Sequence, residues 1–125
     1  SDFSRTKAHS SNLYFGASLP ALILLGKEKG YTFVGTNTIG ANAFFIRDDL
    51  APQITSLLDS ISGYPSSFRE ARDKTEKLLL LGGLQRSETI KNSPLFDIKN
   101  KKNTSLYSLG EIYSSNWKNG QRNTF

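Results

Sequence analysis

Residues 18–47 constrain the fold more than any other part of the sequence, because their hydrophobic pattern changes from helical to strand-like within a short distance. Ser18 is a suitable helix N-cap, and Gly30 fits the position that follows a helix C-terminus. The apolar residues between them recur on one helix face, and Pro20 is tolerated in the first turn. The pattern predicts a helix over residues 18–29.

Two strand-like runs follow this helix. Residues 31–36 and 43–47 are rich in β-branched and aromatic side chains, and the residues between them contain the Asn and Gly typical of turns. Bulky apolar side chains occupy adjacent positions, as Phe44 and Phe45 do, and such strands are usually covered on both faces. The sequence therefore predicts an α/β fold containing a helix–strand–strand unit whose strands form an antiparallel hairpin.

A second amphipathic helix is expected after the hairpin. Asp49 can cap this helix, apolar residues recur at helical spacing, and Gly63 can end it. The periodicity is weaker beyond that point. A short charged helix is expected at residues 68–73, a short helix at 84–91 and a short strand at 95–98. The apolar run at residues 78–81 is too short to be assigned to a helix or a strand from its periodicity.

Composition excludes several classes of function. The chain contains no Cys, and His9 is its only His, which rules out thiolate chemistry and a His-based zinc cluster, so no metal site is expected. Its longest apolar run, residues 19–25, is far shorter than the roughly 20 residues that span a bilayer. No basic-then-apolar leader precedes it. We expect a cytoplasmic protein without a membrane span and, because Met is absent, a piece of a longer protein.

The net charge of +5 raises the alternative of a small basic nucleic-acid binder. The excess of positive over negative charge is only +1 in residues 1–85 and +4 in residues 86–125. The densest cluster of lysines lies at residues 99–102, in an Asn-rich stretch. A single-strand binder interleaves aromatic side chains with such a cluster, whereas those of this chain follow it at wide spacing. Nucleic acid is therefore the weaker alternative.

Motifs of common catalytic sites are absent, and the catalytic residues stay unassigned. Gly82 and Gly83 lack the further glycine and the Lys of a phosphate-binding loop. A Ser-His-acid triad would have to use His9, which lies in an irregular lead-in. The adjacent Asp48 and Asp49 fit a helix cap and its neighbour better than a pair of catalytic carboxylates.

Two arginines and one asparagine are candidates for ligand binding. Arg69 and Arg72, three apart on the predicted helix, would share a face and could hold a carboxylate or phosphate. Mutual neutralisation with Glu70 and Asp73 is the alternative for both arginines. Asn42, at the start of the second predicted strand, could bind a ligand or simply serve the turn.

A set of ordered blocks resembles the C-terminal half of FkbM-type methyltransferase-like proteins, relatives of the class I S-adenosylmethionine-dependent methyltransferases. The resemblance extends over residues 3–109. The blocks are YFGASL at 14–19, GKEKGY at 26–31, VG at 34–35, NAFFIR at 42–47 and FREARD at 68–73.

The resemblance implies that the predicted helix and hairpin are the end of a Rossmann-like sheet, since the class I fold finishes with a helix, a sixth strand and an antiparallel seventh strand. Residues 1–62 would complete that sheet, residues 63–109 would form a helical extension packed on it, and residues 110–125 a polar, flexible tail. The glycine loop and the acidic residue that bind S-adenosylmethionine belong to the absent half. The cofactor is therefore expected only in the longer protein, with that N-terminal half as partner, and this chain alone should be inactive.

A small-molecule, natural-product or glycan acceptor is also implied by the resemblance. The candidate substrate-binding residues are Tyr14, Asn42, Arg69 and Arg72. A non-catalytic binding or assembly module, which keeps the end of the fold without the cofactor half, stays open as the alternative to a methyltransferase.

Overall fold

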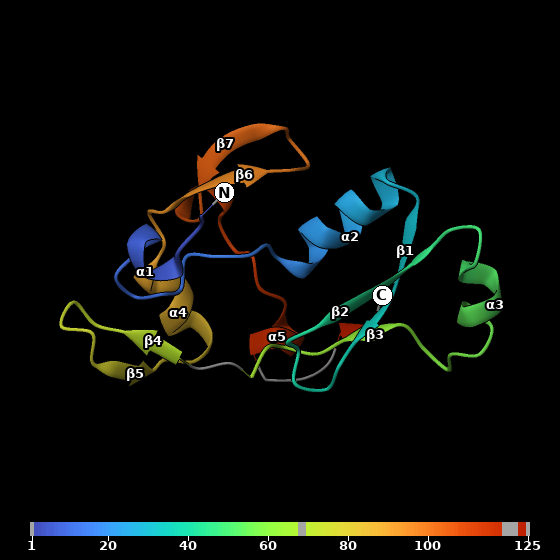
Figure 1. Cartoon of the computed structure of the whole chain (residues 1–125), viewed down its shortest axis with the longest axis horizontal. Helices are drawn as coiled ribbons and strands as arrows, with labels where there is room; N and C mark the ends of the chain where they lie inside the picture. The colour runs from blue at the N-terminus through green and yellow to red at the C-terminus, as the bar shows by residue number, and fades with distance from the viewer. Residues whose placement is uncertain (1, 68–69, 119–122, 125) are drawn as a thin grey trace. The chain divides into compact units, whose positions relative to one another are not determined.

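The computed structural model describes residues 2–67, 70–118 and 123–124 (Figure 1). The chain is a mixed α/β protein in which the strands form small antiparallel sheets of two strands each. It divides into two compact units that are discontinuous in sequence. Unit 1 comprises residues 1–16 and 68–112, and unit 2 comprises residues 17–67 and 113–125.

Unit 2 begins with the helix that the sequence predicts. Helix α2 spans Leu19–Glu28, and the Oγ of Ser18 accepts a hydrogen bond from the backbone N–H of Ala21 at 3.3 Å. Gly30, with φ of +78°, follows in the left-handed conformation that glycine adopts at little steric cost. Both ends of α2 are therefore set by local residues.

The predicted antiparallel hairpin is confirmed. Strand β1 (Tyr31–Thr36) pairs with β2 (Ala43–Arg47), and Phe33 stands opposite Phe45. A register shift between Phe33 and Gly35 leaves an extra residue in β1, which bends the ribbon locally. Figure 1 shows α2 lying alongside this hairpin.

The core of unit 2 lies between α2 and one face of the hairpin. A Cβ added at Gly26 would lie 3.1 Å from the Phe45 ring, so the missing side chain allows helix and strand to approach closely. Phe33 is buried, whereas Phe44, one residue from Phe45, is 52% exposed. The described residues of this unit thus do not supply the predicted cover on the face that carries Phe44.

The helix expected after the hairpin is much shorter than predicted. Helix α3 spans only Ala51–Thr55. Asp49 does not cap it, because its carboxylate accepts hydrogen bonds from Arg47 Nε at 3.0 Å and Nη2 at 2.6 Å. Leu57, which the apolar repeat would bury, is 78% exposed. Short helices depend on packing, and this apolar stripe stays largely open to solvent.

Regular structure also occurs in the segment predicted to be a flexible tail. Helix α5 spans Ser115–Lys118, and strand β8 (Asn123–Thr124) pairs with β3 (Ser62–Gly63). The rings of Tyr113 and Trp117 stack with centroids 3.8 Å apart. No hydrophobic periodicity in the sequence marks these elements.

Unit 1 corrects the prediction of a helical extension. Residues 70–72, expected to lie in a charged helix, form strand β4 (Glu70–Arg72), which pairs with β5 (Leu78–Leu80). Ala71 is fully buried between two charged neighbours, an alternation that suits a strand. The Arg72 N–H also donates to the backbone oxygen of Ser11 at 3.0 Å. These strand-type interactions outweigh the weak helical spacing.

The rest of unit 1 contains one predicted helix and one predicted strand. Helix α4 (Gly83–Thr89) and strand β6 (Pro94–Asp97) lie close to the expected positions. The other elements are helix α1 (Arg5–Ala8), strand β7 (Lys102–Ser105), which pairs with β6, and the 3-10 helix η1 (Tyr107–Leu109). The basic cluster at residues 99–102 spans the turn between β6 and β7 and the first residue of β7.

Candidate functional site

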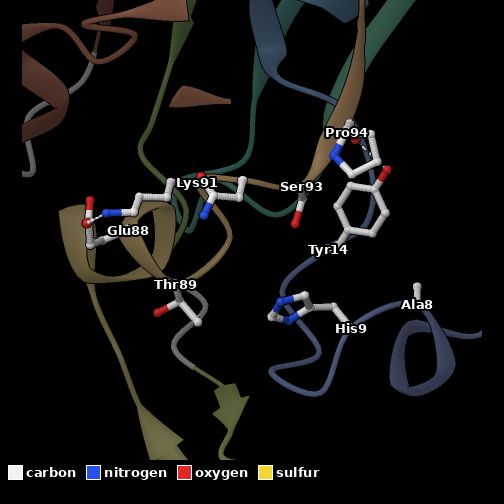
Figure 2. Close-up of a pocket in the computed structure, with 9 residues that line it drawn as sticks. Ala8, His9, Tyr14, Glu88, Thr89, Lys91, Ser93 and Pro94 are labelled. Carbon is white, nitrogen blue, oxygen red and sulfur yellow. Dashed lines mark hydrogen bonds and ion pairs between the residues drawn. The ribbon is translucent and has the colours of Figure 1, made fainter. Parts of the chain in front are cut away.

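A cleft of about 460 Å³ in unit 1, called the unit 1 cleft below, is lined mostly by polar and charged side chains. Its volume falls within the roughly 300–1,000 Å³ of small-molecule sites. Figure 2 shows side chains from the N-terminal segment facing others from α4 and the residues that follow it. The lining residues are Ala8, His9, Tyr14, Glu88, Thr89, Lys91, Asn92, Ser93 and Pro94.

The imidazole of His9 is held in one tautomer. The backbone N–H of Ser11 donates to His9 Nδ1 at 3.2 Å, so Nδ1 acts as an acceptor. The Ser11 hydroxyl lies 2.8 Å from the same atom and accepts the N–H of Leu13 at 3.2 Å, which leaves its proton for Nδ1. The neutral ring therefore carries its proton on Nε2, as a hydrogen-bond donor for the cleft.

Ser11 and His9 do not form a nucleophilic pair. The Ser11 side chain is buried, with 2% of its surface exposed, and its oxygen already accepts the Leu13 N–H. A serine nucleophile needs an accessible oxygen and a base placed to take its proton during attack. Ser11 is a positioning residue that fixes the His9 ring.

Glu88 and Lys91 form an ion pair on one wall of the cleft. Lys91 Nζ lies 2.5 Å from Glu88 Oε1, and both side chains are partly exposed. The hydrogen bond from the Lys91 ammonium to Glu88 and the charge of that carboxylate raise the pKa of Lys91 above its usual value. Lys91 therefore stays cationic, and the two fixed charges of the wall offset each other.

Tyr14 is the one predicted site residue that lines this cleft. Its hydroxyl donates to the backbone oxygen of Pro94, eighty positions further along the chain. The ring is thereby fixed as a wall of the cleft, beside Pro94 (Figure 2). The sequence predicted Tyr14 as a substrate contact, but it indicated neither the partner of its hydroxyl nor the residues that face it.

Arg72 lies in unit 1 but outside the lining of the cleft. Its guanidinium donates to the backbone oxygen of Glu76 at 3.0 Å and lies 3.4 Å from the Glu70 carboxylate. These interactions support the neutralisation alternative for Arg72. Its predicted companion, Arg69, lies outside the described residues.

Asn42 serves the hairpin turn of unit 2 through its backbone. Its N–H donates to Asn37 Oδ1 at 3.1 Å, and its carbonyl accepts the Asn37 N–H at 3.2 Å. The side-chain oxygen of Asn37 also accepts the N–H of Ala41 at 2.9 Å. The turn function considered for Asn42 is thus present.

Unit 2 contains a second, smaller hollow of about 230 Å³ between α2 and the hairpin. It is almost wholly apolar and borders the core already described. Its lining residues are Leu22, Leu25, Gly26, Lys29, Tyr31 and Phe45.

The described residues place two limits on the chemistry of the chain. Across residues 2–67, 70–118 and 123–124, no three acidic or His side chains come together in a way that could hold a metal ion. None of the helices found in those ranges is both long and apolar enough to cross a membrane.

Comparisons with protein-family models, with curated proteins and with solved structures find no match to this chain. The resemblance to FkbM-type proteins therefore rests on the sequence blocks alone.

Proposed function

We propose that this chain is the C-terminal, sheet-completing part of an S-adenosylmethionine-dependent, FkbM-type methyltransferase-like protein. The supporting observation is the succession of α2, β1 and β2, in which β2 returns antiparallel to β1. The same succession ends the class I methyltransferase fold that the sequence blocks resemble. In this proposal the hairpin belongs to a larger Rossmann-like sheet.

The pairing and the solvent exposure of β2 support this proposal. In the part of the chain that the structure describes, β2 pairs with β1 alone. An unpaired strand edge presents backbone donors and acceptors that proteins usually pair or cover, and an isolated two-stranded hairpin is only marginally stable. Phe44 of β2 is 52% exposed, which gives an additional strand or helix an apolar surface to bury.

The missing N-terminal half would supply the cofactor site, and a small molecule or glycan would be the methyl acceptor. Methyl transfer proceeds by in-line attack on the cofactor's sulfonium carbon, for which positioning provides much of the rate. Tyr14 is the candidate substrate contact that lies in a cleft, whereas Arg72 is engaged by Glu70 and Glu76.

The decisive experiment is calorimetric titration of S-adenosylmethionine into two proteins, namely this chain and the longer protein encoded together with its upstream sequence. We expect binding by the longer protein and none by the chain alone. Binding by the isolated chain, or its failure in a folded longer protein, would contradict the proposal.

Complementation tests the role of the β2 surface. The upstream half, produced separately, should recover S-adenosylmethionine binding when this chain is added. Phe44→Asp should weaken that recovery at least tenfold, because it places a charge on the surface to be buried. Ile39→Asp, in the hairpin turn, is a matched control because its exposure of 55% is close to the 52% of Phe44.

A non-catalytic binding module is the second candidate, and the unit 1 cleft favours it. The residues of this chain form that cleft without any contribution from a cofactor-binding half. If the longer protein folds but fails to bind S-adenosylmethionine, while a ligand occupies the cleft, the binding module becomes the better description.

A further inference from the structure

We propose that the unit 1 cleft binds a neutral, polyhydroxylated ligand of the size of a monosaccharide unit. This inference uses unit 1 alone and holds whether or not the methyltransferase proposal does.

The charges of the lining favour a neutral ligand. Lys91 and Glu88 are the two side chains with fixed charge in the cleft, and they lie 2.5 Å apart with opposite signs. An anion would gain from Lys91 but be repelled by Glu88, and a cation would meet the reverse. His9 is neutral in the observed hydrogen-bonding arrangement, because Nδ1 accepts the Ser11 N–H. The lining therefore selects no ion of either sign.

The hydrogen-bonding groups of the lining match hydroxyl groups. His9 Nε2–H and the Lys91 ammonium are donors, whereas the Glu88 carboxylate is an acceptor. Thr89 donates its own proton to the Gln85 backbone oxygen at 2.7 Å, which leaves its oxygen as an acceptor. Each hydroxyl of a polyol both donates and accepts, so neighbouring hydroxyls can satisfy donors and acceptors together.

Two further polar groups remain available for such a ligand. Across the described ranges of the chain, neither the Ser93 hydroxyl nor the Asn92 side-chain amide has a protein hydrogen-bond partner. Both groups can donate and accept, and both line the cleft with His9. Figure 2 labels Ser93 among these lining residues.

The Tyr14 ring supplies the apolar part of the site. Its hydroxyl is engaged by the Pro94 carbonyl, so the ring is fixed, and the aromatic face is what it offers to a ligand. The face of an aromatic ring is electron-rich and attracts the weakly positive C–H groups of a sugar ring. A polar wall opposite one fixed aromatic ring suits a ligand that has hydroxyls at its edge and C–H groups on its face.

The test is a titration monitored by NMR on the whole chain, in a buffer free of sugars and phosphate. His9 is the only His, so its ring signals report on the cleft without overlap from another imidazole. The neutral probes are D-glucose and N-acetyl-D-glucosamine, the anions are phosphate and acetate, and the cation is glucosamine. We expect a neutral sugar to shift the His9 ring signals in a saturable way and the ions to leave them unchanged.

Variants then locate the binding site. In the variants binding is followed through the backbone amide signals of the other cleft residues, because His9→Ala removes the ring signals. His9→Ala and Tyr14→Ala should each raise the dissociation constant of that sugar at least fivefold, which is about 1 kcal/mol. Phe96→Ala is the control, since Phe96 is an exposed aromatic residue of β6 in the same unit that does not line the cleft. It should change affinity less than twofold. Amide spectra verify that each variant is folded. If Tyr14→Ala does not fold, His9→Ala alone decides the test.

Three results would overturn the proposal. The first is the absence of any saturable shift of His9 with either neutral sugar. The second is saturable binding of phosphate or acetate that strengthens in Glu88→Gln, which would assign the cleft to anions. The third is sugar binding that His9→Ala leaves unchanged, which would place the ligand elsewhere on the chain.

Discussion

The rings of Phe33 and Phe45 face each other across the hairpin of unit 2, with centroids 5.5 Å apart and planes inclined by 56°. Tilted arrangements of this kind are favourable for aromatic pairs and contribute roughly 0.5–1.5 kcal/mol beyond burial. A Cβ added at Gly26 of α2 would lie 3.1 Å from the Phe45 ring, so this ring also packs close to the helix. The pair therefore joins both strands and the helix into one core.

Replacing a ring of this pair should destabilise unit 2. Phe33 is 6% exposed, so we expect Phe33→Ala to cost about 3–5 kcal/mol, as is typical of buried aromatic residues. Phe44→Ala is the matched control in the same hairpin and should cost much less, because Phe44 is 52% exposed. Urea unfolding monitored by circular dichroism measures both. Equal losses for the two variants would show that the core lies elsewhere.

A second prediction concerns Gly40, in the turn of the hairpin. Its φ is +63°, and an added Cβ would overlap the backbone of Pro65 at 2.6 Å as well as the Tyr64 oxygen. Gly40→Ala should cost roughly 1–2 kcal/mol for the left-handed backbone and about 1–3 kcal/mol more for the overlap. Gly16→Ala is the control, since φ is +75° there but nothing lies within 4 Å. Denaturant unfolding should show a clearly larger loss for Gly40→Ala, and similar losses would contradict the close approach.

The parts of the fold predicted correctly have local determinants. The Ser18 cap and Gly30 define the two ends of α2. The turn between β1 and β2 depends on Asn37, whose side-chain oxygen accepts the backbone N–H groups of Ala41 and Asn42. The α3 prediction failed because a helical repeat needs a surface to pack against, and Leu57 finds none among the described residues. Local sequence does not contain that information.

The unit 1 cleft could be predicted only in part, for the same reason. Tyr14 was a candidate from the sequence, but its partner Pro94 is far away along the chain, and no motif links them. Glu88 and Lys91 are spaced as an ordinary surface ion pair, and Ser93 carries no signal of its own. Only the folding of residues 1–16 against residues 68–112 brings these groups together.

The turn between β4 and β5 predicts a dependence of stability on pH. Asp73 Oδ1 accepts hydrogen bonds from Thr75 Oγ1 at 2.7 Å, Thr75 N at 2.8 Å and Lys77 N at 3.0 Å. These bonds, above all those from Thr75, lower the pKa of Asp73 below its usual value. Because the folded-state pKa lies below the unfolded value of about 3.9, this stabilisation is present above that pH and is lost as pH falls through the folded pKa.

Melting temperatures of Asp73→Asn between neutral and strongly acidic pH test this dependence. We expect the variant to be less stable than the wild type at neutral pH and to lose less stability on acidification below about pH 4. Asp97, whose pKa Asn100 lowers, should retain part of the acid sensitivity. Asp59→Asn is the control, because Asp59 is exposed and has no hydrogen bond among the described residues. An unchanged acid profile in Asp73→Asn would contradict the assignment.

The last prediction concerns the hydrogen bonds that orient His9. Two-bond ¹H–¹⁵N spectra should show the neutral ring protonated on Nε2, because Ser11 N–H and the Ser11 hydroxyl both meet Nδ1, at 3.2 Å and 2.8 Å. Ser11→Ala removes the hydroxyl from Nδ1 and from the N–H of Leu13, which is buried, and should cost roughly 1–3 kcal/mol. Ser10→Ala, at the exposed neighbouring position, should leave stability and ring signals unchanged. Since the Ser11 N–H remains in Ser11→Ala, the Nε2–H form should persist there with broader ring signals. A wild-type ring protonated on Nδ1 would instead remove the donor that the unit 1 cleft requires.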